Sequence, residues 1–93
     1  MTLTLRCVLT AKTRREYAQT LQGNPLSRED AWQRAVELLF ERLVVRWVVH
    51  DVPTDGQREL LLRLRAATPD ERRFVRDALR GHCAEWFPDV EAP

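Results

Sequence analysis

The sequence predicts an all-α fold, a small bundle of about four helices packed around one long central helix. Over most of the chain, apolar residues recur every three or four positions, which is the spacing of one helix face. Helix-start signals precede these segments, and the connections between them are short. A chain of 93 residues with 44% hydrophobic and 31% charged residues is expected to form one globular domain over 1–93.

The central helix is expected over 27–50. Ser27 is a favourable residue for the helix start, and two acidic residues follow in the first turn. Within 43–49 every residue except Arg46 is apolar, so a helix there would need cover on all sides. In so short a chain, that cover comes from all the other elements or from a second subunit. We therefore expect a homodimer.

The other helices are expected at 13–22, 55–67 and 69–87. Each lies at a capping-box pattern, in which a threonine precedes a glutamate or glutamine by three positions: Thr13-Arg14-Arg15-Glu16, Thr54-Asp55-Gly56-Gln57 and Thr68-Pro69-Asp70-Glu71. The third pattern is the strongest, because proline stands at the first helical position. Residues 88–93 are expected to form a frayed acidic tail.

Two segments are also compatible with an α+β fold. Residues 2–8 alternate between polar and apolar side chains, as a half-buried strand does. Residues 43–49 are rich in valine, which favours strands. This alternative places a short strand at 2–8, paired with 43–49 beneath the helices. We favour a helix for 43–49, because the helical pattern enters it without a turn residue, and the conformation of 2–8 stays open.

A row of arginines lies on the expected last helix. Arg72, Arg76 and Arg80 are spaced by four positions with Arg73 beside them, so they share one broad face. Guanidinium groups bind phosphate, which makes these four residues candidates for phosphate binding. Asp77 is placed to pair with part of the row, which favours a solvated face. The net charge of +1 is also low for a dedicated nucleic-acid-binding domain.

The histidines and cysteines form no recognisable catalytic or metal motif. Cys7 and Cys83 lack metal-ligand spacing, and we expect two free, largely buried thiols in a reducing cytoplasm, with a single disulfide as the alternative. His50 and His82 would share a site only if the fold joined two distant helix ends. We expect no cofactor, no metal and no membrane segment, and rank a small enzyme third among the function classes.

The favoured function is a non-catalytic protein–protein interaction module, a small cytoplasmic adaptor or regulator of bacterial type. It would self-associate through the long apolar helix and bind a protein partner. Tryptophan and arginine are enriched at interface hot spots, so the expected interface residues are Val45, Arg46, Trp47, Val48, Trp86 and Phe87. The alternative is a nucleic-acid-binding regulator that uses the four arginines.

Overall fold

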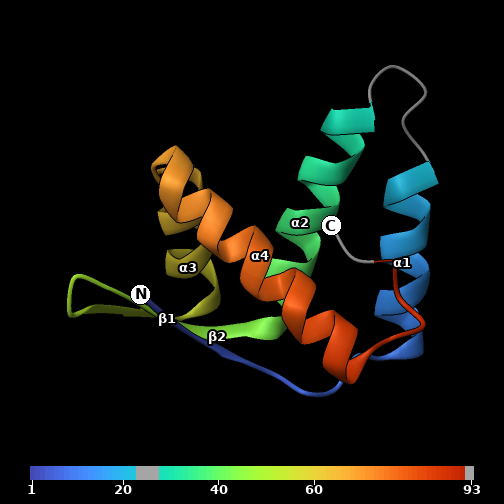
Figure 1. Cartoon of the computed structure of the whole chain (residues 1–93), viewed down its shortest axis with the longest axis horizontal. Helices are drawn as coiled ribbons and strands as arrows, with labels where there is room; N and C mark the ends of the chain where they lie inside the picture. Colours follow the sequence, from blue (N-terminus) through green and yellow to red (C-terminus); the bar gives the residue numbers. More distant parts are fainter. Residues whose placement is uncertain (23–27, 92–93) are drawn as a thin grey trace.

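The computed structural model describes residues 1–22 and 28–91, and within them the fold is α+β (Figure 1). A three-stranded antiparallel sheet packs with four helices in this part of the chain. The elements follow in the order β1 (Thr2–Leu5), α1 (Ala11–Gln22), α2 (Arg28–Leu43), β2 (Val44–Val49), β3 (Val52–Asp55), α3 (Gln57–Arg65) and α4 (Pro69–Trp86). The all-α prediction is therefore wrong, and the α+β alternative is the one found.

The prediction of one long central helix over 27–50 is wrong beyond Leu43. Helix α2 ends at Leu43, and strand β2 begins at the next residue and lies between β1 and β3. Thr2 of β1 pairs with Val48 of β2, so the pairing proposed in the alternative exists, with the strand confined to Thr2–Leu5. A strand can bury its valines under helices on one side, whereas a helix of the same composition would need cover all round.

Strand β3 was not predicted, because residues 52–54 were expected to form the break between two helices and Asp55 the start of the second helix. Val49 pairs with Val52, so only His50 and Asp51 form the loop of a β-hairpin. Both have positive φ angles, 49° and 63°, as in the type I′ turn that suits a two-residue hairpin. The capping box expected at Thr54 is consequently absent, and α3 starts after Gly56, which has no side chain to cap the helix.

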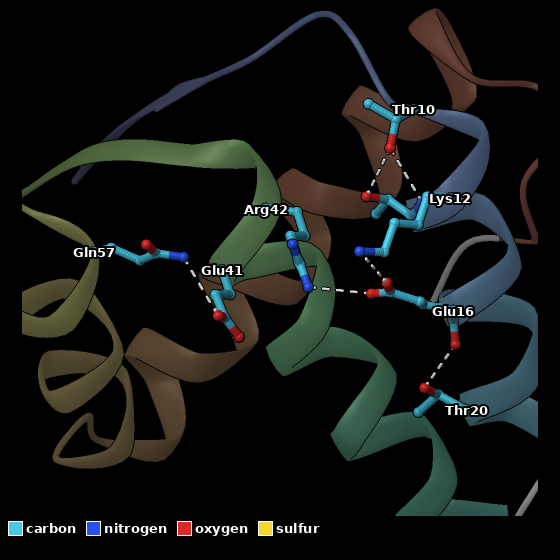
Figure 2. A network of polar contacts seen from close by, with 8 residues as sticks. Thr10, Lys12, Glu16, Thr20, Glu41, Arg42 and Gln57 are labelled. Carbon is cyan, nitrogen blue, oxygen red and sulfur yellow. Dashed lines mark hydrogen bonds and ion pairs between the residues drawn. The ribbon is translucent and has the colours of Figure 1, made fainter.

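The capping box at Thr68 is confirmed. Its Oγ1 accepts a hydrogen bond from the Glu71 N–H at 3.2 Å, and Glu71 Oε1 accepts one from the Thr68 N–H at 3.0 Å. Helix α1 starts earlier than expected, because Thr10, and not Thr13, accepts the first-turn hydrogen bond (Figure 2). The expected cap at Ser27 lies outside the described residues.

The hydrophobic core lies between the sheet and the helices. Its largest fully buried side chains are Trp47, Phe40, Leu39, Leu43, Leu79, Val75 and Cys83. The Trp47 ring meets Phe40 edge-on at 5.9 Å between centroids, and the Arg63 guanidinium lies over it. In the apolar segment expected to need a second subunit, Leu43, Val44, Trp47 and Val49 are thus buried within the chain, whereas Val45 and Val48 are half-buried.

Polar contacts join neighbouring helices and hold the segment after α4 against α1. Glu16 accepts a hydrogen bond from Arg42 of α2 at 3.1 Å, and Gln57 of α3 contacts Glu41 at 3.3 Å (Figure 2). Part of the tail expected to fray, residues 88–91, lies against α1. There Arg14 pairs with Asp89 at 3.0 Å.

Candidate binding groove

A groove of about 770 Å³ runs between α2 and α4. The two helices approach each other near the sheet and separate toward their N-terminal ends (Figure 1). Leu64, near the end of α3, also lines the groove, and so does Pro69 at the start of α4. We call this feature the α2–α4 groove.

The wall formed by α2 combines an apolar strip with a charged rim. Its lining residues are Glu29, Trp32, Gln33, Val36 and Glu37. They are spaced by three and four positions, so they occupy one face over two turns of helix. Trp32 and Val36 are half-buried against the core cluster, whereas Glu29 and Gln33 are exposed. Part of the Trp32 surface therefore remains accessible from the groove.

The wall formed by α4 is basic. Three of the four arginines proposed from the sequence, Arg72, Arg73 and Arg76, line the groove, whereas Arg80 does not. Arg72 Nη2 donates a hydrogen bond to the Arg65 carbonyl oxygen at 2.8 Å, and Arg73 pairs with Asp70 at 3.2 Å. For Arg76, no ion pair or hydrogen bond is formed with any residue that the structure describes.

The opposite wall carries the opposite charge. Within residues 1–22 and 28–91, Glu29 also has no ion-pair or hydrogen-bond partner, and Glu37 makes only a long contact of 4.0 Å to Arg65. An acidic wall and a basic wall thus face each other across apolar side chains. The groove thus combines a partly accessible apolar strip with charges of opposite sign on its two sides.

No family model, curated protein or solved structure matches the chain. The function must therefore be inferred from the chemistry of the α2–α4 groove and from the remaining polar groups.

The six residues proposed as an interface do not form one exposed patch. Trp47 has 0% and Phe87 3% of its surface accessible, so both belong to the core. Arg46 is exposed and pairs with Asp55 at 3.8 Å. Trp86 is half exposed at the end of α4, and the remaining two, Val45 and Val48, are half-buried on β2.

Some polar groups outside the groove make structural contacts, and among the described residues those considered for chemistry are not gathered into a metal site. In the described part of the chain, no three His, Cys, Asp or Glu side chains are grouped so as to hold a metal ion. His82 Nε2 donates to the Arg6 carbonyl oxygen at 2.7 Å, and His50 lies in the hairpin loop. No helix among these residues has the length and apolar content needed to cross a membrane.

Both cysteines are free, but the expectation that both are largely buried is wrong for one of them. Cys83 is buried in the core, and burial raises the pKa of its thiol. Cys7 is exposed, because the chain has left strand β1 before reaching it.

Sequence reasoning found the basic wall of the groove but missed the acidic one. The arginines stand out because they repeat along one helix, whereas Trp32 was not among the expected interface residues. A signal existed in α2, where Glu29, Gln33 and Glu37 repeat at four-residue spacing beside Trp32 and Val36. It could be recognised as one wall of a groove only when the position of α4 was known.

Proposed function

We propose that this protein is a non-catalytic interaction module that binds one segment of a partner protein in the α2–α4 groove. The observation that carries the proposal is the apolar strip of Trp32 and Val36, left partly accessible between two charged walls above the buried Leu64. Apolar surface in a concave setting with a few charged groups around it is typical of binding sites. Tryptophan is also among the residues that contribute most at interfaces.

A protein partner fits the charges better than a nucleic acid does. Phosphate binding needs basic groups without competing anions. In this groove Arg73 is already paired with Asp70 at 3.2 Å, and Glu29 and Glu37 on the other wall would repel a phosphate backbone.

The titratable groups favour binding over catalysis. Three side chains have clearly shifted pKa values, and none of them lines the groove. Burial raises the pKa of Tyr17, whose hydroxyl donates to the Glu91 carbonyl oxygen, and also raises that of Cys83. Glu71 is occupied by its helix cap and by Arg63. Shifted groups at an active site usually face the cleft where the substrate binds.

The proposal favours a partner of different sequence over self-association. The apolar residues of 43–49 were the reason to expect a homodimer, and the side chains of Val44, Trp47 and Val49 are buried within the chain. We place the module in the cytoplasm, where two unpaired cysteines such as Cys7 and Cys83 are stable as thiols.

A peptide-library selection tests this function. Random peptides displayed on phage are selected against the full chain, and the enriched peptides are then titrated by NMR. We expect the backbone signals of the α2–α4 groove to shift, and Trp32→Ala to weaken binding by tenfold or more. Trp86→Ala is the matched control, because Trp86 is exposed and lies outside the groove.

Two results would contradict the proposal. One is that no peptide binds in a Trp32-dependent manner. The other is that a DNA or RNA oligomer binds the groove tightly, with an affinity that falls steeply with salt and depends on Arg76. The second result would support the nucleic-acid alternative instead.

A further inference from the structure

We propose that the occupant of the α2–α4 groove is an amphipathic helix with acidic residues along one flank and basic residues along the other. This inference rests on the proposed function, since it names the kind of partner segment that the groove accepts. It has three parts, which concern the backbone of the occupant, its length and its charge.

The backbone of the occupant is helical because of what the groove walls are made of. Both long walls are α-helices, whose backbone N–H groups beyond the first turn bond within each helix. An extended segment would find no strand edge there, and its own backbone groups would lose water without gaining partners. A helix satisfies its backbone internally and needs only side-chain contacts, as in other helix-in-groove complexes.

The length of the groove sets the contact at about two turns. On α2 the lining residues extend from Glu29 to Glu37, and on α4 from Pro69 to Arg76. At the helical rise of 1.5 Å per residue these walls are roughly 10 to 12 Å long. A partner helix of that contact length presents apolar side chains at i, i+3, i+4 and i+7, which would meet the partly accessible Trp32 and Val36.

The charges fix both flanks of the partner and its direction. Arg76 on one wall and Glu29 on the other have no ion-pair partner among the described residues, so both are available to a ligand. The acidic flank of the partner therefore lies beside α4 and its basic flank beside α2. Turning such a helix end for end would exchange its flanks, so only one direction places both flanks against opposite charges.

The experiment uses three synthetic helical peptides with one common apolar face. The first has glutamates on one flank and lysines on the other, the second has glutamates on both, and the third has lysines on both. Each is labelled with a fluorophore and titrated with the full-length protein at low salt, with anisotropy as the readout. We expect the mixed peptide to bind most tightly.

Protein variants then assign each flank to a wall. Arg76→Glu should weaken binding of the mixed peptide by about fivefold, which is the effect of one ion pair of about 1 kcal/mol. It should not weaken binding of the all-lysine peptide. Glu29→Arg should weaken binding of the mixed peptide to a similar extent and should not weaken binding of the all-glutamate peptide. Arg15→Glu on α1 is the matched control, since Arg15 is exposed and does not line the groove.

The outcomes separate this inference from the proposed function. Equal binding of the three peptides, or no effect of either charge reversal, overturns the charged-flank assignment. Library peptides that bind through Trp32 but remain extended in the complex overturn the helical assignment and leave the proposed function in place. If neither the helical peptides nor the library peptides bind through Trp32, both proposals fail.

Discussion

Arg63 of α3 and Glu71 of α4 are joined across the turn between their helices. Arg63 Nη2 donates a hydrogen bond to Glu71 Oε2 at 2.9 Å, and the guanidinium carbon lies 5.0 Å from the ring centroid of Trp47. The other Glu71 carboxylate oxygen accepts the Thr68 N–H. Arg63 first, and then Thr68, hold the pKa of Glu71 below its usual value. One carboxylate thus links the helix cap, the interhelical turn and the centre of the core.

The first prediction is that Glu71→Gln makes the fold less sensitive to acid. A carboxyl whose pKa is lower in the folded state stabilises the fold above its unfolded pKa, and the contribution is lost as the pH falls through the folded pKa. The wild type should therefore lose stability below about pH 4.5, the ordinary value for glutamate, more steeply than the variant. At pH 7 the variant should have the lower melting midpoint.

Thermal melts from pH 7 to pH 3 test this. Glu85→Gln, at an exposed position of α4, is the control and should preserve the wild-type pH dependence. Parallel curves for the wild type and Glu71→Gln would show that the contact with Arg63 contributes nothing to the acid response.

The second prediction is that Thr68→Ala destabilises the protein by about 1 kcal/mol, the usual cost of removing a helix cap. The variant leaves the Glu71 N–H without the Thr68 oxygen, which accepts it at 3.2 Å. Thr68→Ser keeps the hydroxyl and should stay within a few tenths of a kcal/mol of the wild type. Urea denaturation measures the stability of both variants. Equal midpoints for Thr68→Ala and the wild type would show that the cap does not stabilise the fold.

The third prediction concerns the hairpin loop between β2 and β3. His50 and Asp51 both have left-handed backbone angles, which cost non-glycine residues roughly 1 kcal/mol. The double change His50→Asn and Asp51→Gly gives the Asn-Gly pair that a type I′ turn prefers, and it should stabilise the fold by about 1 kcal/mol. Asp55→Gly, at a residue of β3 without positive φ, should give no gain. A lower melting midpoint for the Asn-Gly variant would contradict this loop geometry.

The fourth prediction is that the two cysteines differ sharply in reactivity. Cys7 is exposed, whereas Cys83 is buried and its pKa is raised by burial, so Cys83 presents little thiolate and no access. A thiol reagent at pH 8 should modify one cysteine rapidly and the second only when denaturant is added. Cys7→Ser should abolish the fast phase. Two fast phases in the wild type would mean that Cys83 is not in the core.

Sequence reasoning predicted the start of a helix correctly where a local side-chain interaction determines it. The Thr68 cap is such a case, because its two hydrogen bonds involve residues three positions apart. Residues 43–49 are the opposite case. The same apolar residues can be buried either in a helix or in a strand. The outcome depends on pairing with β1, which is distant in the sequence, and with β3, which was not predicted.

The missed hairpin has a separate physical reason. Neither His50 nor Asp51 is the glycine that usually marks a tight hairpin loop, so the break at this position did not indicate a hairpin. Only the basic wall of the candidate site could be predicted from the sequence, for a related reason. The arginines of α4 follow from the spacing within one helix, whereas the acidic wall of α2 is opposed to them only in the folded chain.

The contacts of residues 82–91 with Arg6 and α1 have a consequence for how the protein is made. Arg14 pairs with Asp89, the Tyr17 hydroxyl donates to the Glu91 carbonyl, and His82 donates to the Arg6 carbonyl. These contacts join residues 74 to 76 positions apart. Helix α1 is translated before residues 87–91, and its contacts with them can form only after those residues have been translated. Folding of this small domain is therefore completed after translation of that segment, and a pause before it would leave α1 exposed to proteases and chaperones.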